Sequence, residues 1–187
     1  MATAMPSASR SRSRGTRIRV RPPQTWPALR KPSSTPVATA AAHRRVRNYI
    51  EVGISEGARL LTGGAEPPAE LKRGYFVRPT VFTGDNSMRI AQEEIFGPVL
   101  VIIPYDDEDQ AIAIANDSPY GLAGAIWSAD PQRARDLAER LRVGRIRING
   151  APLDKRGTHG GFKLSGVGRE WGRIGIEEFL EYKSVIG

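Results

Sequence analysis

The sequence of 187 residues contains no cysteine. The chain therefore forms no disulfide bond and offers no thiolate, either to a metal ion or to a substrate. Its two histidines, His43 and His159, lie far apart and belong to no ligand motif, so we expect no zinc site. No apolar run approaches the roughly 18 residues that a membrane-spanning helix needs. We therefore expect neither a metal site nor a membrane partner.

Acidic residues are missing from the first quarter of the chain. Residues 1–47 hold 11 of the 28 Lys and Arg residues and none of the 20 Asp and Glu residues. The formal net charge of +8 therefore belongs to this segment, because the remainder carries 17 basic and 20 acidic residues. A nucleic-acid-binding domain is expected to carry its positive charge on a folded face. The distribution of charge thus argues against nucleic acid as the partner of the folded part.

Residues 1–43 are rich in Arg, Ser, Pro and Ala and show no helical or sustained strand period, so we predict that they are disordered. Three interpretations of this basic tail compete. It has the composition of a transit peptide, which is rich in Arg and Ser and poor in acids. It has the arginines to bind nucleic acid or an anionic surface. The third interpretation, which we favour, is a misassigned start or a shifted reading frame.

The rest of the chain alternates predicted helices and strands, which indicates an α/β fold. Apolar residues recur at three- and four-residue steps from Val46 to Leu61, and they predict a helix from about Arg44 to Gly63-Gly64. The glycine-rich segment 150–169 is predicted to be a loop. Strands are expected at 75–83, 99–103, 123–127, 146–148 and 181–186, a short helical turn from Ser87, and helices at 106–116, 130–141 and 172–179.

One stretch, Gln92 to Val99, places two carboxylates and an aromatic ring just before an apolar strand. In extended backbone, alternate side chains face the same way, which predicts that Glu94 and Phe96 share one side. A carboxylate beside a flat ring suits a ligand that carries hydroxyls next to an aromatic group. The alternative is a buried Phe and a solvated Glu at the entrance of a strand. The residues alone leave both interpretations open.

The residues Glu93-Glu94-Ile95-Phe96-Gly97-Pro98-Val99 resemble a motif of the NAD(P)-dependent aldehyde dehydrogenase family. Further stretches resemble the same family and follow in its order. The resemblance runs from about Arg44 to Gly187, the C-terminal part of such an enzyme. It implies part of an aldehyde dehydrogenase catalytic domain, with a Rossmann-like α/β sheet. The further stretches are 49–64, 119–124, 143–149 and 160–166.

The resemblance also implies roles for particular residues. Glu94 would accept hydrogen bonds from the nicotinamide ribose of NAD or NADP, and Phe96 would pack near the nicotinamide. The loop at 160–168 would lie at the substrate mouth, where the family usually has Pro-Phe before Gly-Gly. This chain has Thr158-His159 there, which makes His159 a candidate substrate-pocket residue. The last strand, 181–186, would join a sheet used for oligomerisation.

The family reaction needs a cysteine thiolate to attack the aldehyde, before hydride passes to NAD(P)+. Because the chain has no cysteine, we assign no catalytic residue and expect the chain to be inactive by itself. We also expect that it does not bind the cofactor by itself. One alternative is a non-catalytic module that docks on a full-length relative through the last strand. The other is a nucleic-acid-binding protein with a basic tail. We expect a cytoplasmic location.

Overall fold

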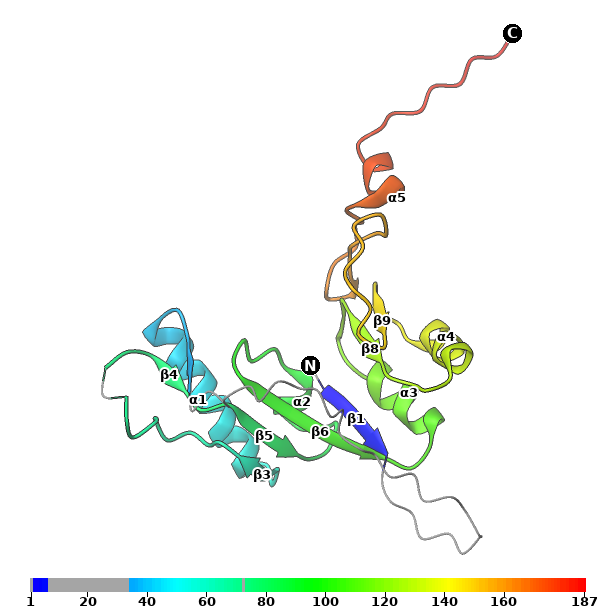
Figure 1. Cartoon of the computed structure of the whole chain (residues 1–187). Helices are drawn as coiled ribbons and strands as arrows, with labels where there is room; N and C mark the ends of the chain where they lie inside the picture. The colour runs from blue at the N-terminus through cyan, green and yellow to red at the C-terminus, as the bar shows by residue number, and fades with distance from the viewer. Residues whose placement is uncertain (1, 7–33, 72) are drawn as a thin grey trace, which may run out of the picture. The chain divides into compact units, whose positions relative to one another are not determined.

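The computed structural model describes residues 2–6, 34–71 and 73–187. The chain forms two compact units, Met1–Asp107 and Glu108–Gly187, which are described separately (Figure 1). Within the described residues, no helix has the length and apolar character needed to cross a membrane.

The first unit contains a four-stranded sheet in the order β1-β6-β5-β3. The central strand β6 (Val99–Tyr105) pairs in parallel with β5 (Thr80–Thr83) and with β1 (Ala2–Pro6). The edge strand β3 (Arg59–Thr62) is antiparallel to β5. Along β5 and β6, the alternating side chains of Phe82, Val101 and Ile103 are buried, as the strand period requires. A mainly parallel sheet with helices confirms the α/β fold class.

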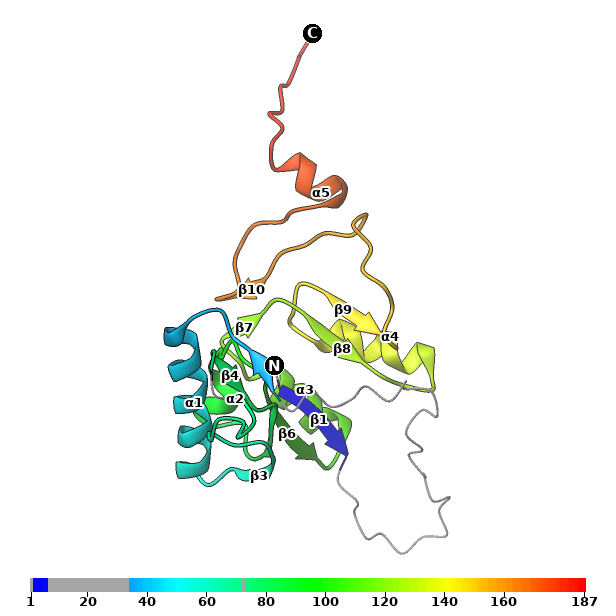
Figure 2. The same cartoon turned by 60° about the vertical axis from the view of Figure 1, so that its left-hand side comes forward.

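Helix α1 (Ala40–Ser55) lies against this sheet (Figure 2). It begins after Thr39, whose hydroxyl accepts a hydrogen bond from the backbone N–H of Ala42 at 3.1 Å. Val46 and Ile50 are fully buried, as the apolar stripe predicted. The helix ends earlier than expected and is followed by β3, so Leu61 lies in a strand and is exposed.

The cause of this early end is Gly57. Its φ of 89° lies in the left-handed region, where glycine is favoured. The backbone N–H of Gly57 donates to the carbonyl of Ile54 at 3.1 Å, and that of Ala58 donates to Gly53 at 2.9 Å. These two bonds form a Schellman motif, which satisfies the last carbonyls and terminates the helix.

The boundary expected at residue 43 also differs from the structure. Strand β2 (Thr35–Pro36) pairs with β4 (Phe76–Val77), and α1 already begins at Ala40. Strand β1 lies at the start of the predicted tail. The disorder predicted for 1–43 is therefore wrong for 35–36 and for 40–43. The reason at α1 is local, because three alanines after a Thr N-cap favour a helix. Residues 7–33 lie outside the described residues.

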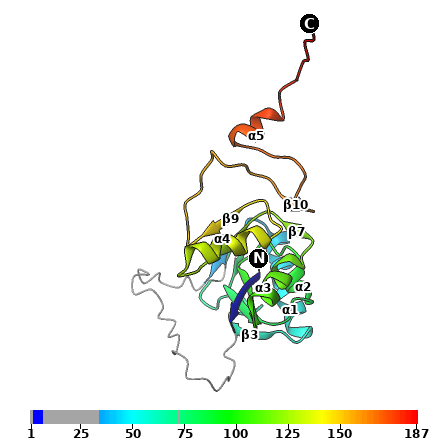
Figure 3. The same cartoon turned by 90° about the vertical axis from the view of Figure 1, so that its right-hand side faces the viewer.

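The second unit holds a parallel pair of strands, β8 (Gly124–Ile126) and β9 (Ile146–Ile148), joined through α4 (Pro131–Arg140). Figure 3 shows α4 beside β9. The predicted N-cap is confirmed, since Asp130 Oδ1 accepts hydrogen bonds from the N–H groups of Gln132 and Arg133 at 2.9 and 3.1 Å. The remaining elements are α3 (Glu108–Asn116), β7 (Tyr120–Gly121), β10 (Phe162–Lys163), which pairs with β7, and α5 (Gly172–Glu177).

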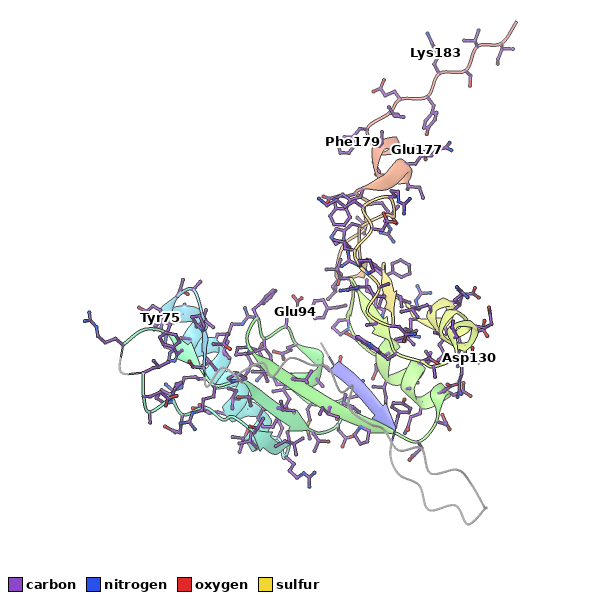
Figure 4. The ribbon with its side chains drawn as sticks, in the orientation of Figure 1. Tyr75, Glu94, Asp130, Glu177, Phe179 and Lys183 are labelled. Atoms are coloured by element: carbon purple, nitrogen blue, oxygen red, sulfur yellow. The ribbon has the colours of Figure 1, made fainter. Side chains whose placement is uncertain are left out.

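The strand expected at 181–186 is not formed in this single chain. After α5 the residues have no regular secondary structure, and Tyr182, Val185 and Ile186 are 80%, 85% and 94% exposed. Figure 4 shows this end of the chain, with Phe179 and Lys183 labelled. A strand exists only where a neighbour accepts its hydrogen bonds. In the described part of the chain, no strand pairs with 181–186.

Candidate functional site

The loop between α2 (Arg89–Gln92) and β6 carries both residues that the sequence singled out. Figure 4 labels Glu94 on this loop. The backbone is not extended as expected, because Phe96 has a φ of 53° and strand pairing begins only at Val99. The alternation argument for Glu94 and Phe96 was therefore wrong. Both side chains are nevertheless exposed, Phe96 by 71%.

Two glycines bring the loop and α2 close to α1. A Cβ atom on Gly97 would lie 2.4 Å from Cγ2 of Val46, which no real Cβ tolerates without movement. A Cβ atom on Gly53 would lie 2.7 Å from Cδ1 of Ile90. Ile90 and Ile95 are both buried at this contact, with 4% and 8% exposure. Gly53 thus weakens α1 intrinsically, yet it lets α2 pack closely against the helix.

Glu93 is the centre of a polar network at this contact. Its carboxylate accepts hydrogen bonds from Arg89 Nε at 2.8 Å and Arg89 Nη2 at 3.1 Å. The Tyr49 hydroxyl donates to the same carboxylate at 2.6 Å. The hydrogen bonds from Arg89 and then from Tyr49 lower the pKa of Glu93 from 4.5 to about 2. Conversely, the hydrogen bond to Glu93 raises the pKa of Tyr49. Glu93 therefore remains ionised at neutral pH.

Arg45 lies one turn before Tyr49 on α1 and reaches the loop itself. Its Nη2 donates to the carbonyl oxygen of Glu94. Its guanidinium carbon stands 5.3 Å from the ring centroid of Phe96 and 5.8 Å from that of Tyr49. Both distances fit cation–π contacts. Arg45 therefore holds the backbone at Glu94 and one face of the Phe96 ring.

Helix α2 takes its N-terminal cap from α1. Met88, the N-cap residue, makes no side-chain cap hydrogen bond. Instead, Glu56 accepts a hydrogen bond from the backbone N–H of Arg89 at 2.9 Å. A carboxylate at a helix N-terminus satisfies an unpaired donor and opposes the positive end of the helix dipole. The loop is thus fixed at its α2 end as well.

The loop backbone is held while its two candidate side chains are free to contact a ligand. Within the described residues, the Glu94 carboxylate accepts no hydrogen bond, since only its main-chain carbonyl is engaged. A free carboxylate offers acceptors to hydroxyl groups, and an exposed ring offers an apolar face. The arrangement therefore suits a ligand with vicinal hydroxyls beside a flat ring.

The third candidate, His159, lies in the second unit. Its backbone N–H and carbonyl each bond to Glu170 at 2.6 Å, and its ring stacks on Trp171 with 4.7 Å between centroids. Its Nδ1 is buried and, among the described residues, has no hydrogen-bond partner. A cavity of about 160 Å³ is lined by the preceding residue, Thr158, together with Arg145 and Asp154. Thr158 therefore lines this cavity, whereas the ring of His159 stacks on Trp171 and is not part of the lining.

The glycine-rich stretch after His159 is used to hold the second unit together. Lys163 Nζ donates to the carbonyls of Asn116 and Ser118 at 2.7 and 2.9 Å. Ser165 Oγ accepts a hydrogen bond from the N–H of Gly121 at 3.0 Å. These side chains are committed to the chain's own backbone. The stretch does not present them as a phosphate cradle.

Sequence reasoning proposed Glu94 and Phe96 as site residues but missed the residues that hold their loop. Arg45 and Tyr49, like Arg89 and Glu93, are spaced i, i+4, which places each pair on one face of a helix. That spacing was readable from the sequence. The contact between the two pairs was not, because Tyr49 and Glu93 are 44 residues apart.

Residues 14–185 match the model of the family described as "Aldehyde dehydrogenase family". The chain belongs to this family. It is 52% identical over 153 residues to a 3-succinoylsemialdehyde-pyridine dehydrogenase from a Pseudomonas species, which covers 81% of this chain and 32% of that relative. The chain thus spans about a third of the length of the curated relatives it matches.

Solved structures agree with this membership. A Mycobacterium tuberculosis aldehyde dehydrogenase complexed with NAD+ is 50% identical, with a TM-score of 0.74, over 77% of this chain and 30% of that one. A Staphylococcus aureus betaine aldehyde dehydrogenase in complex with NAD+ is 42% identical, with a TM-score of 0.73, over 77% of this chain and 29% of that one. The resemblance and the α/β class are confirmed.

The family match extends further towards the N-terminus than the quoted motifs, since it begins at residue 14. It therefore begins inside the segment 1–43, which the quoted motifs did not reach.

Proposed function

We propose that this chain provides the part of an NAD(P)-dependent aldehyde dehydrogenase site that contacts the nicotinamide riboside. In this assignment Glu94 accepts hydrogen bonds from the ribose hydroxyls, and Phe96 packs beside the nicotinamide ring. The observation that carries the proposal is the contrast on the α2–β6 loop. Its backbone is held by Arg45 and α1, while the Glu94 carboxylate and the Phe96 ring stay exposed. The solved relatives that contain NAD+ support this choice of ligand.

The residues present fit that ligand in chemistry. Ribose hydroxyls are hydrogen-bond donors, and the Glu94 side chain offers acceptor oxygens with no competing partner among the described residues. The nicotinamide ring is flat, and the exposed Phe96 ring offers a face of matching shape. When bound, NAD(P)+ supplies the hydride acceptor of the family reaction. The contribution of this chain is to bind and orient the riboside.

We further propose that the chain does not oxidise aldehydes by itself. Covalent aldehyde oxidation uses a thiolate, which is both a strong nucleophile and a good leaving group. The chain has no cysteine, and Ser165 is occupied by the backbone of Gly121. Purified chain should show no NAD+-dependent increase in absorbance at 340 nm with a panel of aldehydes. Turnover that disappears in Glu94→Gln would contradict this assignment.

A chimera tests the positive part of the proposal. The matching third of the Pseudomonas relative is replaced by residues of this chain, so that the relative supplies the remaining two thirds. Glu94→Gln in the chimera should weaken NAD+ binding by about 10- to 100-fold, since a hydrogen bond to a charged group contributes about 1.5–3 kcal/mol. Glu51→Gln, an exposed glutamate on α1, is the matched control and should leave NAD+ binding unchanged. Equal NAD+ affinity in both variants would refute the role of Glu94.

A second proposal concerns association. The segment 181–186 exposes Tyr182, Val185 and Ile186 and pairs with no strand of the described chain. Unpaired extended backbone with apolar side chains is a template for strand addition. We propose that this segment pairs with another copy of the chain or with a longer relative. The oligomeric state of the purified chain tests this proposal, as described in the Discussion.

A further inference from the structure

We propose that Glu93 is a positioning residue for the α2–β6 loop, which carries the proposed cofactor contacts. Through Arg89 and Tyr49 it fixes the direction in which the next residues, Glu94 and Phe96, present their side chains. The inference rests on the proposed function, because it concerns how the riboside contacts are aimed.

The first argument is geometric. Glu93 links α1 to α2, since Tyr49 lies on α1 and Arg89 is the first residue of α2. Two parallel N–H donors from one guanidinium, at 2.8 and 3.1 Å, fix the plane of the Glu93 carboxylate. The Tyr49 hydroxyl, at 2.6 Å, fixes it from a third direction. A carboxylate held at three points leaves its own backbone, and hence that of Glu94, little freedom to turn.

The second argument concerns magnitude. The side chains of Arg89 and Glu93 are 52% and 40% exposed. An exposed i, i+4 ion pair contributes little to the stability of a fold. The close packing of Ile90 against Gly53 and of Gly97 against Val46 already attaches α2 and the loop to α1. The hydrogen bonds of Glu93 therefore set the orientation of a loop that is already attached. A fixed orientation is what the side chains of a binding site need.

The third argument comes from Arg45. Its guanidinium contacts the Glu94 carbonyl and the Phe96 ring, and it also stands over the ring of Tyr49. Tyr49 thus contacts both Glu93 and the residue that holds Phe96. If Glu93 releases Tyr49, the support behind Arg45 changes too. The Glu93 side chain restrains the backbone of Glu93, and Arg45 binds the carbonyl of the next residue, Glu94.

The test uses the full chain and measures backbone order by 15N relaxation. Glu93→Gln keeps an acceptor for Tyr49 but removes the charge that holds Arg89. We expect the order parameters of Glu94 and Phe96 to fall from about 0.85 toward 0.6, and that of Ile50 in α1 to remain unchanged. Glu51→Gln removes one negative charge from α1 and should change neither value.

Two outcomes would overturn the inference. Unchanged order parameters at Glu94 and Phe96 would show that Glu93 does not aim the loop. Equal losses at Ile50 would show that Glu93 supports the fold in general. Tyr49→Phe removes only one hydroxyl and should loosen Glu94 and Phe96 less than Glu93→Gln does.

A binding measurement separates this inference from the proposed function. In the chimera, Glu93→Gln should raise the Kd for NAD+ by about 3- to 10-fold, because a loop that is correctly oriented for only part of the time binds in proportion to that fraction. If Glu94→Gln leaves the Kd unchanged, the proposed function fails, whatever the order parameters show. If Glu94→Gln weakens binding and Glu93→Gln does not, the positioning role alone fails.

Discussion

Gly97→Ala tests the close contact between the α2–β6 loop and α1. Gly97 does not have a positive φ, so the backbone itself accepts alanine. The added methyl group would lie 2.4 and 2.7 Å from the two Cγ atoms of Val46. Val46 is fully buried and has no room to withdraw. Inserting one methyl group into such a core costs about 1–3 kcal/mol.

Native-state amide exchange measures this cost in the first unit alone. The amide of Ile50, buried in α1, should exchange about 5- to 150-fold faster in Gly97→Ala, because each 1.4 kcal/mol corresponds to a factor of ten. The amide of Ala134 in α4 is an internal reference and should exchange at its original rate.

A double-mutant cycle separates collision from other causes. Val46→Ala alone should destabilise α1 by about 1.6 kcal/mol or more, for two lost methyl groups. In Gly97→Ala/Val46→Ala the collision is removed. The loss of unfolding free energy in the double variant should therefore be smaller than the sum of the losses in the two single variants, by about 0.5–3 kcal/mol. Gly57→Ala is the control, because its φ of 89° gives strain but its Cβ would meet nothing within 4 Å. Additive effects of Gly97→Ala and Val46→Ala would refute the reasoning.

Three further predictions follow from the described contacts. In carbon NMR the carboxyl of Glu93 should titrate with a midpoint of about 2. Its contribution to stability is then present above pH 4.5 and is lost as the pH falls toward 2. A midpoint near 4.5 would contradict the hydrogen bonds from Arg89 and Tyr49. Asp130→Ala removes the N-cap of α4 and should cost about 1 kcal/mol, with fraying seen in the Cα shifts of its first turn. Glu139→Ala, at an exposed position near the other end of the same helix, should leave that turn intact. Light scattering during size-exclusion chromatography should show that the chain self-associates, and that removing residues 181–186 reduces this; a monodisperse monomer of the full chain would sink the association proposal.

The sequence predicted most clearly those elements whose signals are local. Asp130-Pro131 marks a helix start in both the sequence and the structure, because an N-cap depends only on the next three residues. The strands around Phe82 and Val101 were recognisable from β-branched and aromatic residues. The end of α1 was misplaced because Leu61 happens to continue the apolar stripe. Gly57 was the better signal, since a left-handed cap outweighs one further apolar residue.

Features that depend on a partner were not predictable in the same way. The segment 181–186 has the composition of a strand, yet its structure in one chain follows from the lack of a pairing strand in the described residues. At the site, resemblance identified Glu94 and Phe96, whereas their backbone conformation depends on packing against Val46. The links from Tyr49 to Glu93 and from Glu56 to Arg89 join residues 44 and 33 positions apart. A local sequence pattern does not predict such contacts.

The cap that Glu56 gives to α2 limits where this chain can be divided in engineering. Helix α2 has four residues, far fewer than an isolated helix needs in water. A cut between Ala69 and Glu70 would fall on exposed residues outside any helix or strand, which makes it an attractive split point for a two-piece reporter. The piece beginning after the cut would then carry α2 without its cap and without Tyr49. Its α2–β6 loop should become ordered only when the two pieces reassemble, so that the backbone order parameters of Glu94 and Phe96 would report their association.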